Sequence, residues 1–292
     1  MMKYIIVISV CLFLPSFLFA QDDLMKELEA SQKPEITYIG QTFKGSRIIN
    51  GQSVETKPKG ALEFLFSHRF GKINGGAYTL WGLDQAFVRL GFEYGLTDRL
   101  GIGIGRSSTD KTFDSFLRYK VARQSTGARN FPVTITAMGT ANVKTFPNDN
   151  PLLALADRLS YVGQLMIARK FSSRFSAQIN PIFVHRNTVY KNTENNDDIA
   201  IGGAARYKIT KSMALSGEYY YRVNPKDNTE YYNSVGAGLD IETGGHVFQI
   251  ILSNSLGMIE RAVIAETDGN VKKGDIRLGF NISRTFQIKK LK

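Results

Sequence analysis

The sequence has little cysteine, histidine or tryptophan, and only one long apolar run. Of 292 residues, one is cysteine, one is tryptophan and three are histidines. A single cysteine excludes a disulfide scaffold and a multi-thiolate metal site. After residue 20 no stretch reaches the ~18 uncharged apolar residues that mark a spanning helix, so a helical membrane protein is also excluded. The chain is nonetheless 43% hydrophobic and 22% charged, which is too apolar for a disordered protein.

The first 20 residues have the pattern of a cleavable signal peptide. Lys3 supplies an early positive charge, residues 4–19 are nearly all apolar, and Ala20 precedes a polar stretch. The apolar run is shorter than the ~20 residues of a spanning helix and Pro15 interrupts it, which argues against a membrane anchor. A lipoprotein signal at Cys11 is a second interpretation, but Cys11 lies in the middle of the run. We therefore expect cleavage after Ala20 and export of a mature chain without cysteine.

From residue 61 onward, apolar and polar residues alternate with a period of two, the pattern of β-strands. In the last segment Ile276, Leu278 and Phe280 alternate with Arg277, Gly279 and Asn281. Most such segments are close to the ~9–11 residues that a tilted transmembrane strand needs. The twelve predicted strands are residues 61–70, 84–96, 99–106, 112–122, 131–143, 157–171, 174–186, 198–209, 213–223, 230–241, 245–254 and 274–286.

Short and long connections alternate between these strands. Tight, Thr-, Ser- and Gly-rich connections lie at residues 96–99, 172–173, 210–212 and 242–245, and longer ones lie between them. This is typical of outer-membrane barrels, which have short periplasmic turns and longer external loops. Two connections depart from this alternation. Connection 107–111 is short although it lies at the end with the longer loops, and connection 123–130 is long although it lies at the end with the tight turns. We predict an all-β fold, a transmembrane antiparallel up-and-down β-barrel of about 12 strands with both ends in the periplasm.

The predicted domains are a signal peptide at 1–20, an N-terminal periplasmic segment or plug at 21–60, and the barrel at 61–292. Residues 22–30 are expected to form a short helix. The rest of the segment has short β-prone stretches and a turn signal at Asn50-Gly51. It is either a periplasmic tail or a segment folded into the barrel mouth or lumen. In the second case glycines at 101, 103 and 105 would leave room for an approaching backbone.

The composition of each face of the strands separates a membrane barrel from a soluble one, because in a membrane barrel the apolar face points outward. The apolar face ends in aromatic residues at both predicted rims, as expected at lipid–water interfaces. The lower rim has Phe92, Tyr94, Tyr119, Phe171, Phe175, Tyr207 and Phe286, and the upper rim Phe70, Phe113, Phe183, Tyr221 and Tyr231.

Several motifs resemble a known family. They are SHRFG at 67–71, RLGFEYG at 89–95 followed by TDRL at 97–100, ETGGHVFQ at 242–249 and GFNISRTF at 279–286. They resemble an outer-membrane β-barrel family of Bacteroidota whose function is unknown. The resemblance covers nearly the whole mature chain. It implies the fold and the outer-membrane location, and it offers no activity and no catalytic residues.

Basic residues dominate the predicted inward face, as 37 Lys and Arg against 26 Asp and Glu would suggest. An electropositive lumen concentrates anions, so the first hypothesis is a narrow, anion-preferring, porin-like channel. The alternative is a closed structural or interaction barrel, because about twelve strands leave a lumen that side chains can fill. Apolar residues 258–265 could also plug the mouth. The proposed anion path is lined by Arg69, Arg89, Arg118, Lys120, Arg158, Arg186, Arg206, Arg222 and Arg277, with Lys170 and Lys208 also inward.

An outer-membrane hydrolase is a third and weaker hypothesis. A serine nucleophile needs a histidine base oriented by a third group, and neither His68 nor His185 has an acid partner evident from the sequence. We therefore predict no enzyme, and no cofactor or metal site. The predicted partners are outer-membrane lipids and, if the barrel conducts, small anionic solutes; nucleic acid is not expected for an exported barrel, and the oligomeric state is left open.

Overall fold

The computed structural model describes residues 35–145, 154–189 and 192–288. The predicted signal peptide and the helix predicted at 22–30 lie outside this range. The described chain forms two compact units. The smaller contains residues 35–38 and 125–131, and the larger contains residues 39–124 and 132–288.

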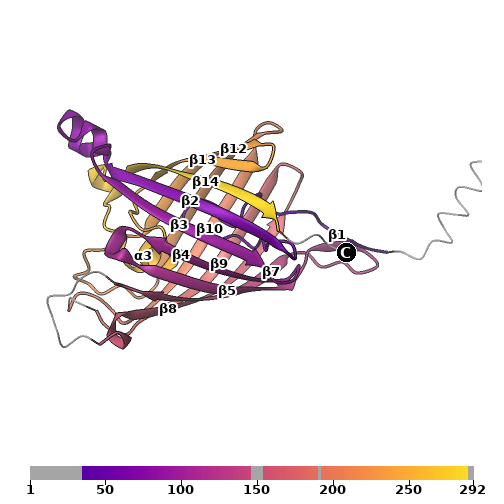
Figure 1. Cartoon of the computed structure of the whole chain (residues 1–292), viewed down its shortest axis with the longest axis horizontal. Helices are drawn as coiled ribbons and strands as arrows, with labels where there is room; N and C mark the ends of the chain where they lie inside the picture. Colours follow the sequence, from indigo (N-terminus) through magenta and orange to yellow (C-terminus); the bar gives the residue numbers. More distant parts are fainter. Residues whose placement is uncertain (1–34, 146–153, 190–191, 289–292) are drawn as a thin grey trace, which may run out of the picture. The chain divides into compact units, whose positions relative to one another are not determined.

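Twelve antiparallel strands of the larger unit close into a barrel, as predicted (Figure 1). In chain order they are β2 (Ala61–Lys72), β3 (Ala86–Gly95), β4 (Leu100–Ser107), β5 (Phe113–Ala122), β7 (Thr134–Val143), β8 (Leu159–Lys170), β9 (Phe175–Arg186), β10 (Asp197–Lys208), β11 (Met213–Arg222), β12 (Ser234–Thr243), β13 (His246–Ser253) and β14 (Arg277–Gln287). Each strand pairs with its neighbours in sequence, and β14 pairs with β2 to close the ring.

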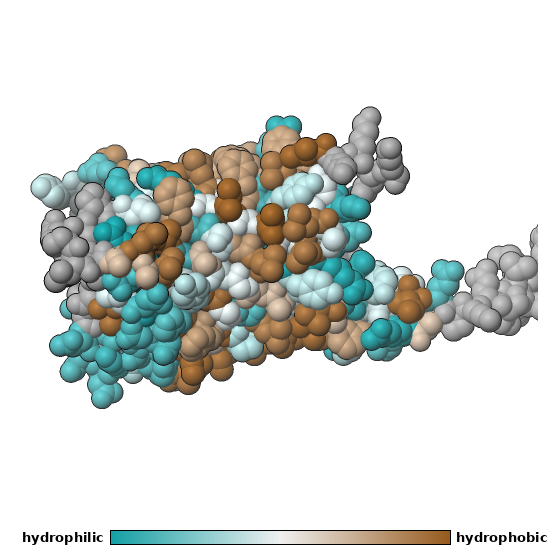
Figure 2. Space-filling model, turned by 60° about the horizontal axis from the view of Figure 1, so that its bottom comes forward, coloured by the Kyte–Doolittle hydropathy of each residue, from teal (hydrophilic) through white to brown (hydrophobic). Residues whose placement is uncertain are grey.

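The period-two pattern of the sequence becomes the two faces of the barrel wall. Along β5, Asp114 and Arg118 point inward and are buried, whereas Phe113 and Leu117 point outward and are exposed. Figure 2 shows apolar side chains spread over the visible wall. Ile104 and Leu117 are 63% and 52% exposed, and apolar side chains exposed over a whole wall mark a surface that contacts membrane or protein.

The two ends of the barrel differ, and we call them the turn end and the loop end. The turn end has connections 96–99, 171–174, 209–212 and 244–245, and the loop end has the longer connections, including 73–85 and 254–276. Three of the tight turns use one device, a hydroxyl that accepts a hydrogen bond from the backbone N–H three residues later. The donors are Leu100 N to Thr97 (2.9 Å), Phe175 N to Ser172 (3.0 Å) and Met213 N to Thr210 (3.0 Å).

The unexpectedly long connection 123–130 has a structural use in the smaller unit. There β6 (Ser125–Gly127) pairs antiparallel with β1 (Ile36–Tyr38). Gly127 has a φ of 88°, and a Cβ there would lie 2.2 Å from the Glu35 carbonyl oxygen. Both the backbone conformation and the close approach therefore require glycine.

We call residues 39–60 the lumen segment, because its residues 42–43 and 46–57 are buried inside the barrel, whereas residues near its two ends are exposed. Residues 46–53 form a hairpin, with Arg47 bridged to Gln52 and the predicted turn residues Asn50 and Gly51 at its tip. Phe43, Ile48, Ile49 and Val54 of the segment pack with wall residues Phe116, Met138, Met166 and Ile251 in a core inside the lumen. The barrel is thus filled by protein over this part of its length.

Glycines do make room for the lumen segment, but at another position than predicted. A Cβ at Gly95 would lie 2.1 Å from the carbonyl oxygen of Pro58, so the backbone passes there. A Cβ at Gly103 would instead lie 2.1 Å from the Phe116 ring, and one at Gly105 would lie 2.3 Å from the Arg89 guanidinium. The expectation that glycines 101, 103 and 105 accommodate a backbone was wrong, because side chains from the wall itself occupy that space.

The connection between β13 and β14 also enters the barrel, from the loop end. It contains α3 (Glu260–Ala265), all six residues of which are buried. Val263 and Ile264 pack with Val162, Ile182 and Tyr220 of the wall. Among the described residues, no helix is long and apolar enough to cross a membrane.

Candidate functional site: the charged interior of the barrel

Several inward-facing arginines of the wall are paired with acids two strands away. Arg89 on β3 donates to Asp114 on β5 at 2.9 and 2.5 Å, and both side chains are almost fully buried. Arg206 on β10 donates to Asp240 (2.8 Å) and Glu242 (2.6 Å) on β12. Such pairs replace the water that a buried charge would otherwise require.

Three of the predicted path residues bind the lumen segment. Arg69 donates to the Asn50 side chain at 2.8 and 3.2 Å. Arg118, which is fully buried, donates to the Glu55 carbonyl at 2.7 Å and to the side chain of Gln52, and it pairs with Glu93 at 3.3 Å. Lys120 pairs with the Glu55 carboxylate at 3.4 Å. These cations therefore hold the lumen segment in place.

The remaining arginines form a network near the loop end. Asp198, fully buried, accepts from Arg186 at 2.8 Å and from Arg222 at 2.9 Å. Arg186 also pairs with Glu194 at 3.1 Å, and Arg277 pairs with Asp268 at 2.7 Å.

Arg158 differs from its prediction, because it precedes β8 rather than lying on a strand. It ends the short 3₁₀ helix η3 (Ala156–Arg158), whose residues are not buried. It lines a cavity of about 10 Å³ at the loop end, together with Arg186 and Glu266.

Polar wall side chains satisfy the backbone of the lumen segment. Glu218 accepts hydrogen bonds from the N–H groups of Asn50 (2.9 Å) and Gly51 (3.0 Å). Gln249 donates to the Ile48 carbonyl at 2.7 Å, and Asn281 donates to the Ile49 carbonyl at 2.9 Å. A buried backbone needs such partners, so the wall is complementary to this particular segment.

The hairpin and the α3 connection meet inside the barrel. Glu260 on α3 accepts a hydrogen bond from Gln52 at 2.6 Å and pairs with Arg47 at 3.4 Å. Arg47 also donates to the Met258 carbonyl at 3.1 Å. Segments that enter from opposite ends are thus joined by polar contacts.

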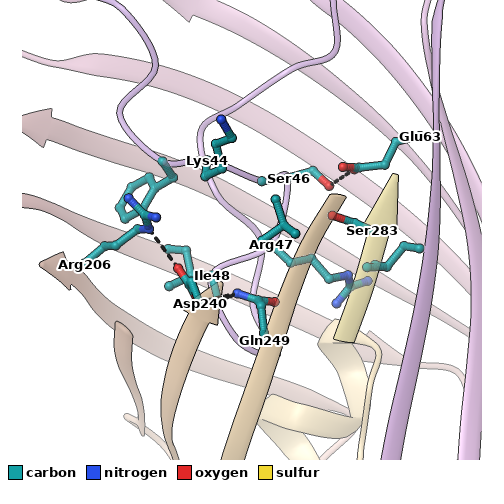
Figure 3. A pocket seen from close by; sticks show the side chains of 13 residues that line it. Lys44, Ser46, Arg47, Ile48, Glu63, Arg206, Asp240, Gln249 and Ser283 are labelled. Atoms are coloured by element: carbon teal, nitrogen blue, oxygen red, sulfur yellow. Dashed lines mark hydrogen bonds and ion pairs between the residues drawn. The ribbon is translucent and has the colours of Figure 1, made fainter. Parts of the chain in front are cut away.

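The cavities left beside the hairpin are small. Figure 3 shows one of about 10 Å³ between the hairpin, the Arg206–Asp240 pair and Gln249. A second, of similar volume, lies between Ser46, Glu63 and Arg89. Each has room for about one water molecule, so in this conformation neither admits a solute.

Glu266, which follows α3 in the loop-end connection, has a strongly perturbed pKa. Burial alone would raise the pKa of this carboxyl, but the charges of Arg261, Lys144 and Arg186 outweigh burial and lower it to about 2. The carboxylate therefore stays ionised and holds three cations at the loop-end mouth.

Five of the acids that pair with interior bases could not be assigned an inward position from the sequence. Glu55, Glu194, Glu260, Glu266 and Asp268 come from connecting segments, not from strands. Periodicity assigns a side only to strand residues, so no signal in the sequence placed these acids against the arginines of the wall.

The histidines lie on the outward face. His68 stacks on Phe280, with ring centroids 5.0 Å apart. His185 does have an acid partner, contrary to expectation: its Nδ1 lies 2.6 Å from Asp197 Oδ1. Asp197 opens β10 directly opposite His185, so the pair is a cross-strand contact.

A sequence model of a family described as a membrane-bound beta barrel domain, DUF5777, matches residues 43–286. The chain belongs to this family. The DUF5777 match begins at Phe43, so it includes most of the lumen segment together with the wall. Because the family is described as membrane-bound, the apolar outward face of the barrel is its lipid-facing surface.

Solved structures similar to this DUF5777 barrel include a NanC porin (11% identity, TM-score 0.48, covering 79% of this chain and 100% of the porin). Others are a KdgM porin (9%, 0.47, 77% and 99%) and Salmonella typhi OmpF in complex with daunomycin (8%, 0.39, 77% and 97%). A search of curated proteins found no match.

Proposed function

We propose that this protein is an outer-membrane barrel that is closed at rest and acts as a structural or interaction barrel. The observation that carries the proposal is the junction of Glu260 with Arg47 and Gln52, where the hairpin and α3 meet. The contacts around it are polar, and the side chains of Arg47, Gln52 and Glu260 are buried. A small number of displaced side chains would not open a path through such a filled interior.

Recording from planar bilayers tests closure directly. The mature protein, refolded and checked by circular dichroism, should give no steady conductance, whereas deletion of residues 42–57 should produce conductance steps. Steady conductance from the intact protein would refute closure. A folded deletion variant that stays silent would show that the α3 connection alone seals the barrel, which deletion of residues 258–265 in the same background would then test.

An anion-preferring channel is the second candidate, and the surplus of bases over acids on the inward face of the strands favours it. Loss of the lumen segment frees Lys120 from Glu55, and it also frees Glu63 from Lys57 and Glu242 from Lys44. The charge of the opened lumen is then set by the wall, which retains its arginines. The opened barrel would then be electropositive and prefer anions. Reversal potentials of the deletion variant in a salt gradient decide this, and a preference for cations would eliminate the channel hypothesis.

We propose an outer-membrane location, which the membrane-bound barrel family and the predicted signal peptide support. We place the turn end and both ends of the barrel in the periplasm, with residues 1–20 removed after Ala20. Mass spectrometry of the N-terminus of protein extracted from isolated outer membranes tests both points. We assign no enzymatic activity; loss of a hydrolytic activity in the His185→Ala variant would contradict that assignment.

A further inference from the structure

A cavity of about 230 Å³ opens at the turn end, and it is strongly basic. Its walls are the start of the lumen segment, at residues 41–44, and the turn-end parts of β8, β9, β10 and β12. Five cationic side chains line it, against the single carboxylate of Glu242. The cations are Lys44, Lys170, Arg174, Arg206 and Lys208.

Not all of these charges are compensated by the protein. Arg206 pairs with Asp240 and Glu242, and Lys44 pairs with Glu242 at 3.2 Å. Lys170 donates only to a neutral group, the Gln41 carbonyl, at 3.0 Å. Within the part of the chain that the structure describes, Arg174 and Lys208 have no ion-pair partner. They are also neighbours, because Lys208 N donates to the Arg174 carbonyl at 2.8 Å.

Like charges that line one cavity repel one another, and an anion among them relieves the repulsion. The cavity also differs from much of the interior, where arginines such as Arg89, Arg186 and Arg222 each pair with an acid. Hydroxyl groups of Thr42, Ser173 and Ser176 lie on the same lining, and these can donate to oxyanions. The cavity volume corresponds to about eight water molecules, which suits a compact molecule.

We propose that the turn-end cavity binds a small polyvalent anion, a molecule with two or more phosphate or carboxylate groups. The guanidinium of Arg174 recognises one group by paired hydrogen bonds, and Lys170 and Lys208 neutralise a second. This site does not depend on whether the barrel conducts. It lies outside the sealed interior and is open to the turn-end solution.

Isothermal titration of the mature protein in neutral detergent micelles at low ionic strength tests the site, with pyrophosphate and citrate as probes. The Arg174→Ala/Lys208→Ala double variant removes two cations without breaking an ion pair that the structure shows. It should lose at least tenfold in pyrophosphate affinity. The matched control is Lys211→Ala, because Lys211 is an exposed base in a turn of the same end and lies outside the cavity lining.

The result expected is saturable binding that the double variant weakens and that Lys211→Ala leaves unchanged. The Arg174→Lys/Lys208→Arg variant, which keeps the charges, should retain most of the affinity. Equal weakening in the double variant and in Lys211→Ala would show non-specific attraction and overturn the proposal. Absence of binding by both probes would overturn it too, whatever the conductance. Repeating the pyrophosphate titration with the protein in vesicles of anionic phospholipid distinguishes a lipid headgroup from a soluble anion. A lower pyrophosphate affinity in these vesicles than in neutral micelles indicates that lipid headgroups compete for the site.

Discussion

Replacing Gly51 by alanine should displace the tip of the hairpin from the centre of the barrel. A Cβ at this position would lie 1.5 Å from the Tyr220 hydroxyl oxygen and 2.7 Å from Cζ of the same ring. Tyr220 is only 3% exposed and packs in one cluster with Val263 and Ile264. The ring has little freedom to move away, so the segment must yield.

The size of the effect follows from these contacts. Overpacking a filled interior costs about 1–3 kcal/mol. If the tip moves away entirely, the hydrogen bonds from Asn50 and Gly51 to the Glu218 carboxylate are lost as well, at about 1.5–3 kcal/mol each. We therefore expect Gly51→Ala to lower the free energy of unfolding by at least about 1 kcal/mol.

The assay is equilibrium unfolding of the refolded protein in urea, followed by far-ultraviolet circular dichroism. Gly203→Ala is the matched control, since Gly203 lies on β10 and an added Cβ there would meet nothing within 4 Å. This control should change stability by less than about 0.5 kcal/mol. Tyr220→Leu should partly rescue Gly51→Ala, because it removes the hydroxyl that clashes. If Gly51→Ala and Gly203→Ala unfold at the same urea concentration, the hairpin tip does not lie against Tyr220.

Three further predictions use the same assay. Arg118→Met should cost about 3–5 kcal/mol, because it leaves Glu93 buried beside an apolar side chain; an unchanged midpoint would contradict the buried pair. The folded pKa of Glu266 is about 2, below its unfolded value of about 4.3, so its stabilisation is complete above pH ~4.3 and is lost as the pH falls toward 2. Glu266→Gln should lack that acid-dependent loss, and a parallel pH profile for both proteins would disprove the assignment. Ser172→Ala, at an exposed turn, should cost no more than about 1 kcal/mol, and a larger loss would mean that this turn is needed for the β8–β9 pairing.

The strands could be predicted from the sequence because lipid on one side and a packed interior on the other impose a strict period of two. Every predicted strand overlaps an observed one. The error is largest near residue 230, where Tyr231 was assigned to the upper rim of the wall. Tyr231 instead precedes β12 and donates to Glu194 at 3.3 Å. Aromatic residues near a strand end fit either place, so composition alone does not decide between them.

The filling of the lumen could be predicted much less well. The Asn50-Gly51 signal correctly marked a turn, but turn chemistry is local and does not say what the turn packs against. The partners of the hairpin, such as Glu218 and Gln249, are more than 150 residues away in sequence. No periodic pattern in residues 39–60 reports such contacts, since the segment is neither a strand of the wall nor a helix.

The pairing of β14 with β2 joins the two most distant strands of the barrel, and the hairpin spans this junction. On one side Arg69 of β2 holds Asn50, and on the other Asn281 of β14 holds the Ile49 carbonyl at 2.9 Å. Contacts between residues so far apart in sequence are the slowest to form as a chain folds. Because the hairpin precedes β2 in the chain, it is synthesised before either strand and can serve as a template on which the last strand finds the first. The lumen segment would then contribute to biogenesis of the barrel as well as to its closure.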